Sequence, residues 1–408
     1  MKKLLLLGSN TGSLEIAQYV RNRGDYLIVT DYYPKEKSPA KQIADETWDI
    51  STTDIDQLYE KCIENSVQGV LSSTGEANLK SAMELAERLQ LPFYVNSRCW
   101  NTVNNKIKFK ETCKKYGIPV PKDFSESDPL EDEFPIVVKP ADNCLTRGLS
   151  ICREISELPS ACAYAYENSL AKNIIIEKFV KGIQVNVFYH MVNGEIYLST
   201  VMKSVTNPGT PESCYAVTYN NPENTERYLE KYDEKVRTMM KELGCRNGTA
   251  IVQAIESQGE MYFLEMNYRL DGLGFFQTLK EASGIDAVKI ITDVSLDGKT
   301  DFIPVSYRKE NEGVYCIYSL WTYKTCRIDK IKGVREIQEI LPDLHFQMVC
   351  EEGMETEVVP GTGAMMMNIS FCRKSQKEIS ETIREINRMV FVYDQENKDI
   401  LAKFTGDL

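Results

Sequence analysis

The stretch YFLEMNYRLDGLG, residues Tyr262 to Gly274, decides how the rest of the chain is interpreted. It begins with apolar residues, as a buried strand does, and then places Glu265, Asn267 and Arg269 two residues apart. Successive residues of a strand point to opposite faces, so these three polar side chains share one face. The rest of the chain must explain why a strand carries an acid, an amide and a guanidinium on one side.

Two interpretations fit this stretch on its own. A carboxylate beside an amide oxygen suits Mg²⁺, which prefers oxygen ligands, and Arg269 suits a phosphate or carboxylate because its guanidinium donates bidentately. The alternative is a solvated strand edge with an Arg–Glu ion pair. Short motifs often match by accident, so the surrounding sequence has to decide between the two.

Composition narrows the class of protein. The chain has 408 residues, enough for about two to three domains, and 42% of them are apolar. Its net charge of −12 argues against a sequence-independent nucleic-acid binder, although it leaves room for a local ATP pocket. No apolar run approaches the length of a transmembrane helix, and the initial MKKLLLLGSN has too short an apolar run for a signal peptide. We expect a first strand there and no membrane partner.

Cysteine and histidine usage excludes several chemistries. The twelve cysteines are scattered and form no C-x-x-C pair, which indicates reduced thiols in a cytoplasmic protein. His190 and His345 are the two histidines, too few for a His-rich zinc site, and neither lies in a recognisable triad motif.

The first hundred residues alternate strand and helix, which predicts an α/β unit with a doubly wound parallel sheet. Gly8 and Gly12 lie at the first strand–helix turn, where a dinucleotide-binding fold would hold pyrophosphate. The full G-x-G-x-x-G pattern is missing, so an NAD-dependent oxidoreductase remains a weakly supported alternative.

The remainder mixes helices and strands. We expect one helix over residues 101–116, a strand at PIVVKP, and another long helix over residues 221–244. Turns at Asn193–Gly194 and Gln258–Gly259 predict two β-hairpins. Residues 274–298 are expected to be helical throughout.

Four local features follow one another in the chain. They are Lys106 in NNKIKFKETCKKYGIPVP, Lys139 in FPIVVKPADNCLTRG, the hinge-like IIIEKFVKGIQVNV, and the strand quoted at the start. Their order and separations resemble the ATP-grasp superfamily over nearly the whole chain. The resemblance implies an N-terminal Rossmann-like domain (1–100), an ATP-grasp domain (101–304) with a small clamp subdomain at about 118–182, and a C-terminal α+β lid (305–408).

The resemblance also implies roles for the residues around the nucleotide. Lys106 and Lys139 would bind phosphates, and residues 141–148 would fold over them, with Thr146 and Arg147 as donors. This loop departs from the family because Gly148 is its single glycine.

The predicted hinge would read the base and the sugar. Glu177, through its carboxylate, and the backbone near Phe179 and Val180 would read the adenine amino edge. Gln184 stands where the family often has a glutamate for the ribose hydroxyls, and a glutamine can still bond a hydroxyl.

The quoted strand then becomes the metal strand. Glu265, Asn267 and Gln253 would hold Mg²⁺, with Mn²⁺ as a substitute, and Arg269 would stabilise the transferring phosphoryl group. Gln253 lies where most members have an acid, and this glutamine version resembles carbamoyl-phosphate synthase large subunits.

The implied activity is an ATP-dependent carboxylate–amine ligase that passes through an acyl phosphate and releases ADP and phosphate. Arg269, Lys139 and Arg147 would be its catalytic residues. Its partners would be a small-molecule carboxylate and an amine, with a homodimer left open. The alternatives are bicarbonate activation of the carbamoyl-phosphate-synthase type, biotin carboxylation, which Gln253 opposes, and a non-catalytic ATP-binding module favoured by the glycine-poor loop.

Overall fold

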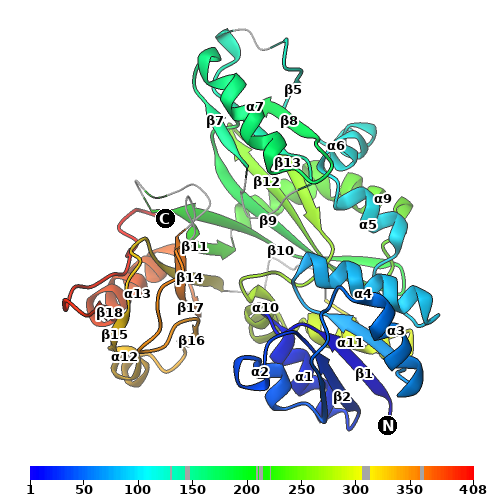
Figure 1. Cartoon of the computed structure of the whole chain (residues 1–408). Helices are drawn as coiled ribbons and strands as arrows, with labels where there is room; N and C mark the ends of the chain where they lie inside the picture. Colours follow the sequence, from blue (N-terminus) through cyan, green and yellow to red (C-terminus); the bar gives the residue numbers. More distant parts are fainter. Residues whose placement is uncertain are drawn as a thin grey trace.

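The structure is a computed structural model of the whole chain. It describes residues 1–128, 131–142, 148–207, 210, 215–220, 222–305, 313–358 and 363–408. Its described residues form three larger sheets and one two-stranded sheet of β15 and β18, with helices packed around them (Figure 1).

The N-terminal sheet is parallel, as predicted, with strand order β3-β2-β1-β4. Leu4 to Leu7 of its central strand are fully buried, which explains the apolar run at the start of the chain. The short β3 was not predicted. The strands are β1 Lys3–Leu7, β2 Tyr26–Thr30, β3 Glu46–Trp48 and β4 Gly69–Ser72, and the helices are α1 Ser13–Asn22, α2 Pro39–Gln42, α3 Ile55–Glu64 and α4 Glu76–Arg88.

The largest sheet is antiparallel and has eight strands, in the order β13-β12-β9-β10-β11-β14-β17-β16. Both predicted hairpins are confirmed, because β9 pairs with β10 and β12 with β13 across turns whose residues have positive φ. The first five strands are β9 Ile183–Val192, β10 Glu195–Thr206, β11 Tyr215–Asn220, β12 Gly248–Ser257 and β13 Glu260–Asn267.

A smaller antiparallel sheet lies beyond one end of this large sheet and carries helix α7 (Figure 1). Its order is β5-β8-β6-β7, and it corresponds to the segment expected to be the clamp. Its elements are β5 Asp123–Phe124, β6 Ile136–Pro140, β7 Ser150–Cys152, α7 Leu158–Glu167 and β8 Ile174–Lys178.

Three helix predictions need correction. The single helix expected over residues 101–116 is wrong: Asn105 caps a new helix, so α5 and α6 are separate. The helix expected over 221–244 is interrupted by a π-helical turn, and the one expected over 274–298 breaks at Gly284, whose φ of 73° favours glycine. The observed helices are α5 Ser97–Val103, α6 Lys106–Lys115, α8 Pro222–Tyr228, α9 Glu234–Glu242, α10 Phe275–Ser283 and α11 Ala287–Asp297.

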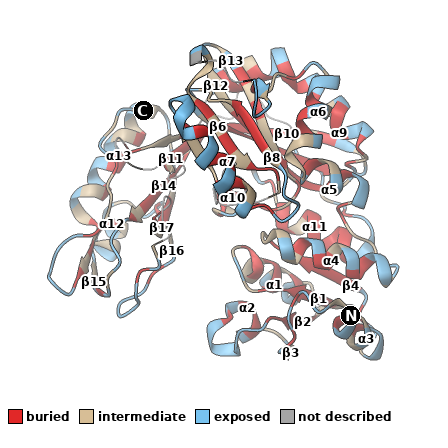
Figure 2. Ribbon diagram, turned by 45° about the horizontal axis from the view of Figure 1, so that its top comes forward, coloured by how far each residue is buried: buried red, intermediate tan, exposed pale blue. Residues whose placement is uncertain are grey.

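The C-terminal segment is less separate than the sequence predicts. Three of its strands continue the large sheet, because β14 pairs with β11 and then with β17, which pairs with β16. Figure 2 shows buried residues along these three strands and along the other strands of the same sheet. The elements are β14 Val314–Thr322, β15 Ile328–Lys332, α12 Val334–Ile340, β16 His345–Met348, β17 Ala364–Arg373, α13 Gln376–Met389 and β18 Phe391–Asp394. No helix in the described ranges is long and apolar enough to cross a membrane.

Candidate active site

Strand β13 carries Glu265 and Asn267 of the opening stretch, and Arg269 follows two residues after its end. A β-bulge modifies the alternation of this strand. Glu265 pairs with Gln253 of β12, whereas Phe263 pairs with Ala254, so β13 has one extra residue between them. A bulge of this kind lets residues three apart share a face. Tyr262 therefore faces the same side as Glu265, which simple alternation does not predict.

Beyond the bulge the predicted alternation is confirmed. Met266 and Tyr268 are buried in the core, while Glu265, Asn267 and Arg269 are partly exposed on the opposite face. The two-residue spacing in the sequence thus separates core residues from site residues.

Glu265 is the charged centre of this face. Its carboxylate lies 3.4 Å from the Lys106 ammonium and accepts a hydrogen bond of 3.2 Å from the Asn267 amide. Burial alone would raise the pKa of Glu265, but the charge of Lys106, the Asn267 bond and the charge of Lys139 outweigh it and lower the pKa. Glu265 is therefore ionised at neutral pH and available to a cation.

Helix α6 brings Lys106 to this carboxylate. Asn105 caps the helix by accepting a hydrogen bond from the Lys108 backbone N–H at 3.0 Å. Lys106 is the first residue of the helix, so the cap fixes where its side chain begins.

Lys139 enters from the small sheet and is bound to an acid of the same sheet. Its ammonium contacts one carboxylate oxygen of Glu177, and the other oxygen accepts from Lys110 at 2.7 Å. Burial opposes ionisation of Glu177, but the two lysines outweigh it and lower its pKa. The Glu177 side chain, which the sequence analysis assigned to the adenine amino edge, faces these two lysines.

Arg269 lies where the strand meets the N-terminal unit. Its guanidinium lies 3.6 Å from the Glu76 carboxylate at the start of α4 and donates to the Leu270 carbonyl at 2.9 Å. Its Nε is buried and has no hydrogen-bond partner. A buried donor without a partner is costly, so this guanidinium is suited to receive an anion.

Gln184 belongs to a row of neutral polar side chains that crosses the large sheet. Its amide oxygen accepts from the Tyr215 hydroxyl, and its NH₂ donates to Asn186 at 3.3 Å. Asn186 then donates to Ser204, whose hydroxyl is 2.8 Å from that of Thr218. This row continues the face that carries Gln253 and Glu265, because Asn186 pairs with Gln253 across β9 and β12.

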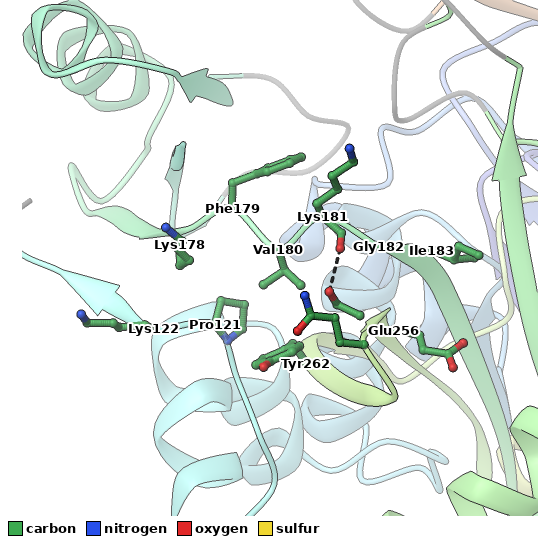
Figure 3. Close-up of a pocket in the computed structure, with 12 residues that line it drawn as sticks. Pro121, Lys122, Lys178, Phe179, Val180, Lys181, Gly182, Ile183, Glu256 and Tyr262 are labelled. Atoms are coloured by element: carbon green, nitrogen blue, oxygen red, sulfur yellow. Dashed lines mark hydrogen bonds between the residues drawn. The ribbon is translucent and has the colours of Figure 1, made fainter. Parts of the chain in front are cut away.

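A cavity of about 770 Å³ opens at the outer end of this face (Figure 3). The hinge residues Phe179 and Val180 line it, together with Pro121 of the preceding linker and Tyr262 of β13. Close packing holds the hinge against the hairpin: the Ser257 hydroxyl donates to the Lys181 carbonyl at 2.8 Å. Lys106, Lys139 and Glu265 do not line this cavity, but Tyr262 of the same strand as Glu265 does, so β13 connects the cavity with the charged part of the site.

The described residues bring most of the predicted set together. Lys106, Glu265, Asn267 and Gln253 adjoin one another, and Lys139 acts on Glu265 through its charge. Thr146 and Arg147 lie outside the described residues. Where the chain is described, no three His, Cys, Asp or Glu side chains gather, so a metal here would have one carboxylate and two amide oxygens.

Sequence reasoning missed three residues of the site. Tyr262 was hidden by the bulge, and Glu76 and Lys110 contact partners far away in the sequence. The K-x-x-x-K spacing of Lys106 and Lys110 was the available signal, since residues four apart share a helix face.

One family model matches the segment that contains Lys106, Lys139 and Glu265. Residues 103–273 match the family model of the ATP-grasp domain. The chain therefore contains an ATP-grasp domain. The matched residues include the four features noted in the sequence.

Curated relatives and solved structures extend the likeness beyond this domain. The carbamoyl phosphate synthase large chain of Clostridium beijerinckii is 22% identical over 322 residues, covering 73% of this chain and 29% of that protein. The chain thus spans less than a third of the length of this relative. The L-amino acid ligase of Bacillus licheniformis superposes with a TM-score of 0.78 at 18% identity, covering 97% of this chain and 99% of the other.

A second structure matches to a similar extent. Phosphoribosylglycinamide synthetase from Anaerococcus prevotii has a TM-score of 0.75 at 17% identity and covers 97% of this chain and all of its own. At these identities the similarity establishes the fold. It is a fold that ligases share across full-length chains.

Proposed function

We propose that the protein is an ATP- and Mg²⁺-dependent ligase that activates a carboxylate as an acyl phosphate and joins it to an amine. The observation that carries the proposal is the single strand face on which Glu265, Asn267 and Gln253 adjoin Lys106, within an ATP-grasp domain. Phosphoryl transfer depends mainly on positioning and charge stabilisation, and the side chains of this face would supply both.

The phosphate end of the nucleotide belongs to the charged part of the site. Lys106 and Lys139 would bind the phosphates, with Thr146 and Arg147 as further donors. Glu265, Asn267 and Gln253 would hold Mg²⁺, or Mn²⁺ in its place, which neutralises phosphate charge when bound. Arg269 would stabilise the transferring phosphoryl group and the acyl phosphate, and its buried, unpartnered Nε supports this role.

The base would occupy the cavity at the hinge, and Gln184 would contact the sugar. Tyr262 pairs with Ile255 and Glu265 pairs with Gln253, two residues apart on β12, so the separation along the strand is roughly 7 Å at the usual rise per residue. That span suits a nucleotide whose phosphates lie at Glu265. The backbone of Phe179 and Val180 would bind the adenine amino edge. Glu177 would act on the nucleotide indirectly, by holding Lys139 through their ion pair.

The reaction needs no protein nucleophile. A carboxylate oxygen attacks the γ-phosphorus, and the bond to the β-phosphate oxygen breaks, which yields an acyl phosphate and ADP. The amine then attacks the acyl carbon, and phosphate leaves with the electron pair of the C–O bond as the nitrogen loses a proton. We expect a cytoplasmic protein that acts on small molecules.

A second candidate function is bicarbonate activation of the carbamoyl-phosphate-synthase type. Gln253 at the metal position and the 22% identity to the large chain favour it.

The test is a screen for ADP release with pooled amino acids, other carboxylates or bicarbonate, each with and without amines. We expect ADP and phosphate to form only when both a carboxylate and an amine are present. Release with bicarbonate and ammonia alone would favour the second candidate. AMP and pyrophosphate as products would contradict both.

A further inference from the structure

We propose that Lys110 is a positioning residue that neutralises Glu177, so that Lys139 can present its charge to the nucleotide. The inference rests on the proposed function for the role of Lys139. It concerns a residue that does not itself lie on the phosphate-binding face.

The contacts of Lys110 show how unusual its position is. Only 3% of the residue is exposed, and its ammonium donates to Glu177 at 2.7 Å and also contacts Asp123. Asp123 in turn lies 2.7 Å from Lys114, whose side chain is exposed. A lysine is almost never fully buried without a partner, and this one has two acids.

The charges around Glu177 determine how much positive charge Lys139 presents to a phosphate. Lys110, Glu177 and Lys139 together carry one net positive charge, and the neighbouring Asp123–Lys114 pair adds none. Without Lys110, the Glu177 carboxylate would cancel the charge of Lys139 completely. An anionic phosphate would then meet a neutral pair in place of a cation, in a region where charges interact more strongly than in water.

Helix α6 makes this arrangement part of the site. It presents Lys106 to Glu265 of the large sheet and, one turn later, Lys110 to Glu177 of the small sheet. Asp123 and Glu177 are direct neighbours across β5 and β8, so Lys110 also joins these two strands. One helix thereby sets the positions of both phosphate-binding lysines.

The test is a charge-compensation experiment on Mg²⁺-ATP binding, measured by calorimetry on the full chain, with circular dichroism to verify folding. Lys110→Met should weaken ATP binding by roughly tenfold or more, the scale of one charge interaction in a partly buried site. Lys110→Arg should restore it. Lys114→Met is the matched control: it also removes a lysine bound to Asp123, and should change affinity by less than about twofold.

The double variant Lys110→Met/Glu177→Gln separates charge balance from packing. It should bind ATP within about threefold of Glu177→Gln alone, because no carboxylate remains beside Lys139 and Asp123 keeps its pair with Lys114. A double variant that is folded but binds tenfold more weakly than Glu177→Gln would overturn the inference, as would wild-type affinity in Lys110→Met. If Lys110→Met does not fold, the comparison of the double variant with Glu177→Gln still decides. Failure of ADP release with this binding pattern intact would count against the proposed function alone.

Discussion

Glu265 and Gln253 are paired across β12 and β13. Their side chains have the same length, but one ends in a carboxylate and the other in an amide. Glu265 brings a full negative charge, held ionised against burial by Lys106 and Asn267. Gln253 brings a neutral amide. At the scale of single residues, the proposed metal site therefore rests on one carboxylate.

Exchanging the two side-chain types tests this site. Glu265→Gln removes the only carboxylate among the proposed ligands and should lower kcat by roughly 10²-fold or more. Gln253→Glu introduces the carboxylate that is common in the family, and it should bind Mg²⁺ at least as well and retain measurable activity. The measurement is ADP release against Mg²⁺ concentration. Wild-type behaviour of Glu265→Gln together with an inactive Gln253→Glu would mean that this face is not the metal site.

His190 gives a pH prediction about stability. Burial lowers its pKa to about 3, from an ordinary value of 6.5. The unfolded chain therefore binds a proton below pH 6.5 that the folded protein does not, and stability falls as the pH falls. The contribution is about 2 kcal/mol at pH 5, from about 1.4 kcal/mol per pH unit.

Replacing His190 by Asn should remove that part of the pH dependence while leaving a polar group near Ser199, its partner. Urea unfolding between pH 5 and 7 measures it, and His345→Asn, at an exposed histidine, is the control. An unchanged slope in His190→Asn would show that burial of this imidazole does not drive the effect.

At the scale of elements, the N-cap of helix α6 fixes the position at which Lys106 begins the helix. Asn105→Ala removes the cap and should cost about 1 kcal/mol of stability. It should also raise KM for ATP, since Lys106 begins the helix. Ser375→Ala removes the corresponding cap of α13, where Ser375 accepts from Glu378 N–H at 3.3 Å. Both variants should lose similar stability, and only Asn105→Ala should bind ATP more weakly; equal ATP binding by the two would contradict the role of this cap.

The elements also show how far the sequence alone could lead. The two hairpins and the apolar first strand follow from local turn and burial patterns, and they are confirmed. The bulge before Glu265 and the pairing of β11 with β14 were not predictable in this way, because they depend on contacts between distant segments. The same reason hid the contact of Lys110 with Glu177, 67 residues further along the chain.

Site residues that belong to a local sequence pattern could be predicted, whereas those identified by contacts with distant residues could not. Glu265, Asn267 and Arg269 were singled out by strand alternation, and they do share one partly exposed face. Glu76, which adjoins Arg269, has no local pattern that marks it. The role of Gln184 in a row of neutral side chains likewise required the sheet register.

At the scale of the whole molecule, three parts of the chain contribute to one candidate site. The small sheet supplies Lys139, the large sheet supplies Glu265, and the N-terminal unit reaches Arg269 through Glu76. Figure 1 shows the small sheet at one end of the large sheet and the N-terminal sheet at the other. This arrangement suits a reaction in which ATP and a second substrate approach one strand face from different units.

The most direct test of the acyl-phosphate mechanism traces a carboxylate oxygen of the substrate into the products. The protein is incubated with ATP, Mg²⁺ and amino acids labelled with ¹⁸O in the carboxylate, and the products are analysed by ³¹P NMR. Direct attack of a carboxylate on the γ-phosphorus predicts ¹⁸O in inorganic phosphate, ADP as the nucleotide product, and an amide. Label in AMP, or unlabelled phosphate accompanying amide formation, would contradict the acyl-phosphate mechanism.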